Sequence, residues 1–168
     1  KIVFYLMQSH KLFPILSAKI ENANFNKSNF NKSNLSNSVG HHINFVDTSF
    51  QNALVNSVDY SFADFTRANI SNTSFNGATL EKCIFLDASL NDVDFTEADL
   101  SESYLAGLLL SSALLTNCDL SHAYLFGSNL SRSSYFGTIF DNADLENVSF
   151  KETSLTNCSL KKCNLQNV

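Results

Sequence analysis

The chain has 168 residues, of which 44% are apolar and 16% charged, and its formal net charge is −5. This length suits one domain with a continuous core, and fifteen Phe residues supply more apolar surface than a disordered chain carries. The acidic balance lacks the basic footprint that nucleic-acid binding needs, and no apolar run approaches the roughly 20 residues of a membrane-spanning helix.

Residues 1–16 carry no repeat, and we expect them to be a capping or linker segment. They are apolar enough to cover the end of a coil. Their longest apolar run lacks the basic leader and the cleavage site of a secretory signal. Phe13 and Ile15 fall in register with the repeat that follows, so the coil could begin there. We expect a repeat domain at 17–168 that is part of a longer chain.

From residue 18 onwards the sequence repeats every five residues. The thirty positions divisible by five between 20 and 165 hold large apolar residues, mainly Leu and Phe, except for Gly40. Two residues before each lies a second column, and twenty-eight of its thirty members are Ala, Ser, Thr, Cys or Val. No charged residue falls in either column. The chain therefore has two uncharged columns, one of large and one of small residues, that share a period of five residues.

This spacing predicts an all-β solenoid. Residues two apart in an extended segment point to the same side, so both columns face inward and the other three residues of each unit point outward or turn. A helix with about 3.6 residues per turn cannot keep a five-residue repeat on one face. Small side chains beside large ones would fill a narrow interior without voids.

The unit resembles the pentapeptide repeat proteins, whose motif is A(D/N)LXX. Clear matches are ADFTR, ANISN, ADLSE and ADLEN, which begin at Ala63, Ala68, Ala98 and Ala143. The resemblance covers residues 18–167 and implies a right-handed quadrilateral parallel β-helix of about 7–8 coils, each of about 20 residues. Residues one coil apart would stack, which predicts a ladder of Phe25, Phe45, Phe65 and Phe85.

Residues 36–42 depart from the pattern. Gly40 stands at a large-residue position, and we expect a local bulge in which Val39 or Ile43 fills the space, with a small protruding site as the alternative. His41 and His42 are adjacent, but without a third ligand in view they indicate exposed side chains and no metal site.

Large apolar residues also occupy outward positions in the second half of the chain. Ile84, Tyr104 and Tyr124 share one coil position and should stack on one face. Leu109, Leu114, Phe136 and Ile139 would continue the band around neighbouring faces. Exposed surface of this kind is typical of a protein interface, and the alternative is that these side chains only cover neighbouring coils. The predicted partner-binding residues are Ile84, Leu86, Tyr104, Tyr124, Phe126 and Phe136.

Charge is segregated along the chain. Residues 63–150 hold twelve acidic and three basic residues, whereas the segments before and after are each net +2. Such a region is either a solvated surface or a complement to a basic partner. The candidate acidic face consists of Asp59, Asp94, Asp99, Glu102 and Asp119.

No catalytic motif is recognisable, so we expect no enzymatic activity in this segment, no cofactor and no metal. His122 lies near Asp119 and Ser121, but these two flank an inward residue, and a convex face offers no pocket that excludes water. Four cysteines lie in the small-residue column and form no CxxC, which indicates buried, reduced thiols and a reducing cytoplasm. They are Cys83, Cys118, Cys158 and Cys163.

Two functions remain, and neither involves a membrane or direct contact with nucleic acid. In the first, the rod is a scaffold that binds a protein; the resemblance implies precedents in bacterial effectors, including HECT-like ubiquitin ligases that act in the host cytosol. In the second, it is similar to quinolone-resistance members, whose acidic rods imitate DNA and bind gyrase. The repeat runs almost to Val168, so we expect a downstream segment or end-to-end contact between two rods.

Overall fold

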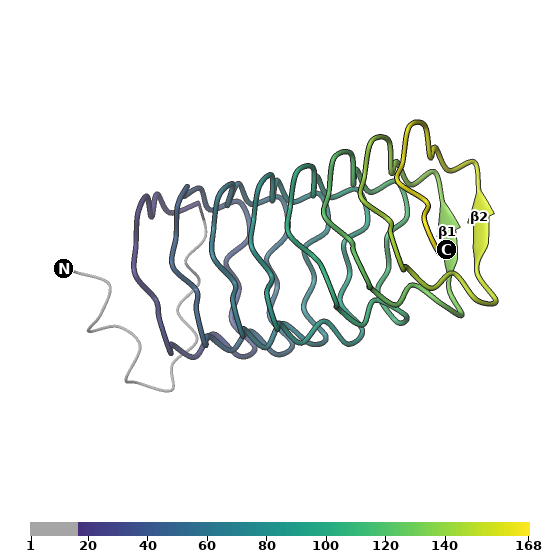
Figure 1. Ribbon diagram of the computed structural model, residues 1–168. Coiled ribbons are helices and arrows are strands. Elements are labelled where there is room, and N and C mark those ends of the chain that lie inside the picture. The colour runs from purple at the N-terminus through teal and green to yellow at the C-terminus, as the bar shows by residue number, and fades with distance from the viewer. Residues whose placement is uncertain (1–16) are drawn as a thin grey trace.

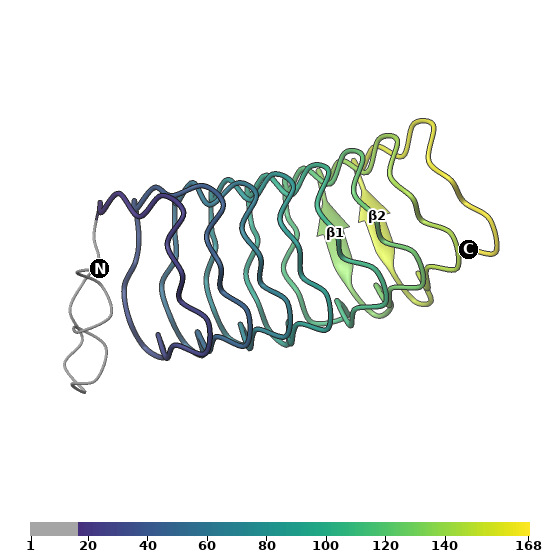
Figure 2. The same ribbon diagram turned by 60° about the vertical axis from the view of Figure 1, so that its left-hand side comes forward.

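The computed structural model describes residues 17–168, which form one rod of stacked coils (Figure 1). Its isolated backbone bridges are all parallel and join residues 20 apart, from Lys19 with Val39 to Asp144 with Asn164. Each coil therefore contains four five-residue units, and the chain advances along the rod without reversing (Figure 2). The predicted parallel solenoid is confirmed. The segment expected at 1–16 lies outside the described residues.

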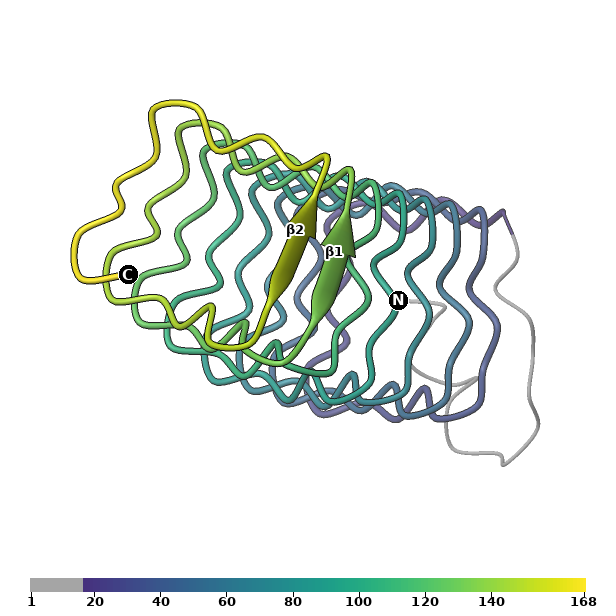
Figure 3. The same ribbon diagram turned by 90° about the vertical axis from the view of Figure 1, so that its right-hand side faces the viewer.

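Extended stretches are short because a turn interrupts the chain in every unit. The two longest form strands β1 (Ser134–Phe136) and β2 (Ser154–Thr156). They pair in parallel, with Ser134 opposite Ser154 (Figure 3). Elsewhere each face contributes single-residue bridges to the coils before and after it.

The unit 63–67 shows how all five backbone N–H groups find acceptors. Those of Asp64, Phe65 and Arg67 donate to carbonyl oxygens of neighbouring coils at 2.9, 2.7 and 2.8 Å. That of Ala63 closes a turn by donating to the carbonyl three residues earlier at 3.0 Å. The fifth, from Thr66, donates to the side-chain Oδ1 of Asp64 at 2.9 Å. Because buried backbone donors must be paired, this pattern explains why the coil is stable.

The aspartate or asparagine of the motif is thus a turn cap. Every Asn or Asp that directly precedes a large inward residue accepts the N–H two residues later, thirteen in all. The residue after that N–H has a positive φ, for example 56° at Asn72, and the glycines at other corners share this conformation, for example 62° at Gly77. Asn and Gly adopt this conformation most readily, which explains their frequency at the corners.

The inward columns form the core as predicted. Phe25, Phe45, Phe65 and Phe85 stack with successive ring centroids 5.5, 5.0 and 5.0 Å apart, which confirms the ladder. In the small column, hydroxyl groups donate to a carbonyl oxygen of the preceding coil, as Thr73 does at 2.7 Å and Ser128 at 2.7 Å. This bond explains why Ser and Thr replace Ala there. The hydroxyl of Ser103 is buried without a partner among residues 17–168.

The cysteines also fit the small column. All four are free; Cys83 and Cys118 are buried, and the other two are half-buried. Burial raises the pKa of the Cys83 and Cys118 thiols well above their ordinary value of 9.0. They are therefore protonated near neutral pH, which makes them poor nucleophiles.

Ile43 fills the space left by Gly40. A Cβ atom at residue 40 would lie 2.8 Å from Ile43 Cδ1 and 2.8 Å from Ile20 Cγ1. Of the two residues expected to fill this space, Ile43 is buried and does so, whereas Val39 is 36% exposed. In this irregular stretch the two columns therefore exchange sizes: the small residue, Gly40, stands in the large-residue column, and the large residue, Ile43, stands in the small-residue column.

Candidate functional site

Five of the predicted partner-binding residues lie together on one side of the rod. Ile84 bridges Tyr104, and Tyr104 bridges Tyr124, so their side chains form a ladder on one face. The two tyrosine rings are 6.1 Å apart and tilted by 33°. Leu86 and Phe126 occupy the corner that follows this face, two coils apart, and are 42% and 47% exposed. We call these five residues the apolar stripe.

The apolar stripe replaces three turn caps. The same ladder begins with Asn24, Asn44 and Asp64 and ends with Asp144 and Asn164, and each of these caps its turn. At the three coils between them, an apolar residue stands where the cap belongs. Consequently the N–H groups of residues 86, 106 and 126 have no acceptor within residues 17–168. A hydrogen bond contributes about 0.5–1.5 kcal/mol, so the stripe weakens three successive turns.

Phe136 does not join the stripe. It lies at the end of β1, more than half a coil beyond Tyr124, and is therefore on another side of the rod. Its side chain is 50% exposed. Leu109 and Leu114 are also exposed, on two of the three faces between Tyr104 and Tyr124 along the chain.

The candidate acidic residues are part of the turn structure. Asp59, Asp99 and Asp119 share one ladder, which Thr79 interrupts. These three and Asp94 cap turns through Oδ1. The fifth residue is paired: Glu102 Oε1 lies 3.3 Å from Lys82 Nζ. The acidic face thus has a structural role on every coil where it occurs.

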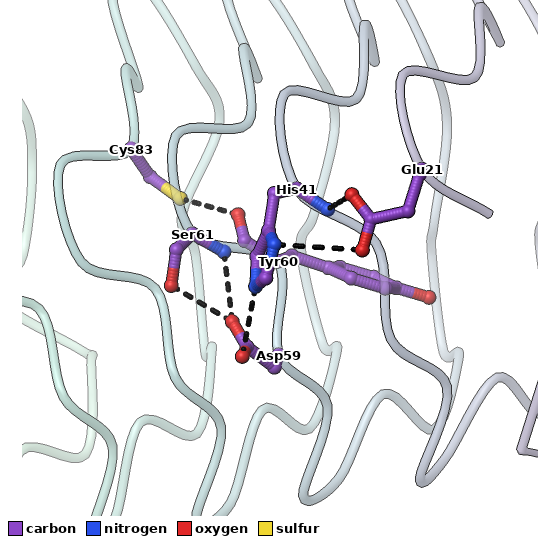
Figure 4. Close-up of polar contacts among 6 residues, drawn as sticks. All are labelled: Glu21, His41, Asp59, Tyr60, Ser61 and Cys83. Carbon is purple, nitrogen blue, oxygen red and sulfur yellow. Dashed lines mark hydrogen bonds and ion pairs between the residues drawn. The ribbon is translucent and has the colours of Figure 1, made fainter. Parts of the chain in front are cut away.

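His41 connects carboxylates on the coils before and after it (Figure 4). Its Nε2 lies 3.0 Å from Asp59 Oδ2, and its Nδ1 lies 3.4 Å from Glu21 Oε1. The hydroxyl of Ser61 donates to Asp59 Oδ1 at 2.8 Å. Partial burial alone would raise the pKa of Asp59, but hydrogen bonds from His41 and Ser61 outweigh it and lower that pKa. Sequence reasoning treated His41 only as an exposed side chain and missed this bridge.

We expect the imidazole of His41 to titrate above its ordinary pKa of 6.5, because the hydrogen bond to Asp59 and the charges of Asp59 and Glu21 outweigh desolvation. The bridge should therefore stabilise the fold fully below pH 6.5, and its contribution should disappear as the pH rises through the raised pKa. NMR titration of the ring protons measures this value. In Asp59→Asn the pKa should fall back; a pKa at or below 6.5 in the unaltered protein would contradict the prediction.

A depression of about 410 Å³ opens beside one end of the apolar stripe. We call it the Tyr124 depression; its lining residues are Glu102, His122, Tyr124, Asn142 and Asp144. The amide of Asn142 lies 3.4 Å from His122 Nε2. The expectation was that no pocket near His122 excludes water, and this depression, which is open to solvent, does not contradict it. The 20-residue spacing of 102, 122 and 142, and of 124 and 144, is the signal that could have revealed it.

The five-residue repeat unit identifies the protein family to which the chain belongs. The family model described as "Pentapeptide repeats (8 copies)" matches residues 43–81, 60–96, 94–132 and 137–168. The chain belongs to the pentapeptide repeat family. Members of this family form right-handed quadrilateral β-helices, which agrees with the parallel 20-residue coil described above. A comparison with curated protein sequences gives no match.

Solved pentapeptide repeat structures share this fold. A trypsin-treated variant of QnrB1, a plasmid-mediated fluoroquinolone resistance protein, is 19% identical over 94% of this chain and 79% of its own, with a TM-score of 0.68. A second trypsin-treated variant of QnrB1 is 18% identical over 94% of this chain and 81% of its own, with a TM-score of 0.54. At this identity the likeness shows the fold alone.

Two further findings concern this pentapeptide repeat protein. In the part that the structure describes, no helix is long and apolar enough to cross a bilayer. Within the same residues, no three His, Cys, Asp or Glu side chains gather in a way that could hold a metal ion.

Proposed function

We propose that this pentapeptide repeat protein is a rigid, non-catalytic module that binds another protein through the apolar stripe. The observation that carries the proposal is the ladder of exposed apolar side chains at Ile84, Tyr104 and Tyr124. The coils on either side have capping Asp residues at the same position, so the apolar residues also replace turn caps there. Aromatic side chains supply large contact areas at interfaces, which offsets the loss of these caps when a partner is bound.

The proposed surface leaves out Phe136, because it faces a different side of the rod. The four free thiols favour a reducing compartment, so we place the protein in a cytoplasm. A role as the recognition domain of a bacterial effector, such as a HECT-like ubiquitin ligase, stays a prediction from the resemblance alone. It is tested by identifying the sequence that flanks residues 1 and 168 in the gene.

Replacing both tyrosines, Tyr104→Ser with Tyr124→Ser, should abolish capture of the partner while leaving the melting temperature unchanged. Both side chains lie outside the core and are exposed, at 42% and 53%, so the fold should not depend on them. The measurement is quantitative mass spectrometry of proteins retained from candidate lysates by the two forms.

A matched control replaces exposed apolar residues elsewhere, Val39→Ser with Leu54→Ser. Proteins lost by the tyrosine variant and retained by the control are specific to the stripe. Equal retention of every protein by the tyrosine variant and the unaltered chain would refute the proposal.

A second candidate function is inhibition of gyrase by imitation of DNA. The ladder of Asp59, Asp99 and Asp119 and the fold shared with QnrB1 favour it. The capping role of those aspartates weighs against it, because the fold itself explains their presence. A supercoiling assay tests it: micromolar protein should inhibit or protect gyrase, and the absence of any effect would count against this function.

A further inference from the structure

The Tyr124 depression has unpaired negative charge. Asp144 uses Oδ1 to accept from the Glu146 N–H at 3.2 Å and from the Asn164 amide at 3.1 Å. Nothing within residues 17–168 donates to its Oδ2 or to Glu102 Oε2. Two carboxylates that line one depression therefore each have an oxygen available to a ligand.

The neighbouring lysine does not neutralise this charge. Lys82 Nζ lies 2.6 Å from Glu81 Oε1 and 3.3 Å from Glu102 Oε1, so one ammonium group serves two carboxylates. Residues 84–147 hold ten acidic residues and one basic residue, Arg132, and the next coil adds Lys161 and Lys162 beside Asp141 and Asn142. Arg132 is itself engaged, with Nε 3.4 Å from Glu152 Oε2. The surface around the depression carries more negative than positive charge, and a cation is its electrostatic complement.

Tyr124 belongs both to the apolar stripe and to the wall of the depression. An aromatic ring beside carboxylates is a favourable environment for a guanidinium or ammonium group, because the ring face and the carboxylates both attract positive charge. Arginine fits better than lysine, since its planar group stacks on a ring and pairs with a carboxylate at the same time. A segment lying on the stripe would place such a side chain in the depression at the step from Tyr124 to Asp144.

We propose that the Tyr124 depression binds an arginine side chain of the partner segment whose apolar side chains cover the apolar stripe. This rests on the proposed function and adds the chemistry of its partner: an apolar segment with an arginine at one end. A free metal ion is a poorer ligand, because no three suitable side chains converge in the described residues.

The test uses Nα-acetyl-arginine amide as the probe and its neutral isostere, Nα-acetyl-citrulline amide, as the matched ligand. In ¹H–¹⁵N NMR spectra of the full chain, the arginine compound should cause saturable shifts at residues 122, 142 and 144. Citrulline should not cause them, and added salt should weaken the binding of arginine.

Substitutions should change the affinity in opposite directions. Glu102→Gln should weaken arginine binding about 3- to 10-fold, and Lys82→Met should strengthen it because a competing cation is removed. Glu97→Gln is the control, because Glu97 is exposed and acidic but does not line the depression. This variant should bind the arginine probe with the same affinity as the unaltered chain.

Equal shifts with citrulline, or equal weakening by Glu97→Gln and Glu102→Gln, would overturn the arginine pocket. The proposed function is tested separately through Tyr104, which does not line the depression. If Tyr104→Ser loses the partner while the arginine probe fails to bind, the binding function of the stripe is supported and the arginine pocket is refuted. If the probe binds but Tyr104→Ser retains every partner, the arginine pocket is supported and the binding function of the stripe is refuted.

Discussion

Replacing Phe65 with alanine should lower the free energy of unfolding by about 3–5 kcal/mol. The ring is fully buried and stacks between Phe45 and Phe85, at 5.0 Å from each. It also meets Phe75 edge-on at 5.9 Å. Because a rod one coil wide has little freedom to collapse around a cavity, neighbouring rings cannot refill the space. Urea denaturation followed by circular dichroism measures the change.

The matched control is Leu165→Ala, which truncates the same column in the final coil. Leu165 is 49% exposed, so its truncation should cost much less than that of Phe65. Similar losses for the two variants would show that the stacked rings contribute no more than ordinary apolar contacts at the end of the rod.

Restoring the repeat consensus with Gly40→Leu should destabilise the protein. The sequence pattern alone would suggest the opposite, since leucine is the commonest residue in that column. However, even a Cβ atom at residue 40 would lie 2.9 Å from the backbone carbon of Ile20 and 2.8 Å from Ile43 Cδ1. Overpacking of this kind costs about 1–3 kcal/mol, and the backbone contact makes the upper part of that range the expected value.

A thermal unfolding scan measures this effect, and Ile43→Ala provides the complementary variant. That change should also destabilise, by about 2–5 kcal/mol, because it empties the space that Gly40 leaves. If Gly40→Leu unfolded at a higher temperature than the unaltered chain, the account of Ile43 as the filling residue would be wrong.

The fold was predictable because burial is periodic in this sequence. The two inward columns specify the coil, and the 20-residue spacing correctly placed Phe25 above Phe45 and Tyr104 above Tyr124. The same spacing places Phe136 on another face, apart from the stripe.

Polar contacts were less predictable, because they depend on side-chain geometry and not on burial. The acidic residues were interpreted as a possible partner surface, whereas Asp94, Asp99 and Asp119 each accept a backbone N–H two residues later. The bridge from Glu21 through His41 to Asp59 joins residues 20 and 18 apart, so it crosses a corner of the coil. A count of residues along faces alone does not reveal such a contact.

The 20-residue coil makes the binding surface sensitive to small changes in chain length. Inserting one five-residue unit between Leu105 and Leu120 would preserve both inward columns and still rotate every later residue by one face. Tyr124 and Asp144 would then no longer follow Ile84 and Tyr104. Inserting a whole coil would restore the alignment at a greater separation. Whole coils can therefore lengthen this rod and keep every later residue on its face, whereas a single added unit divides the recognition surface between two faces.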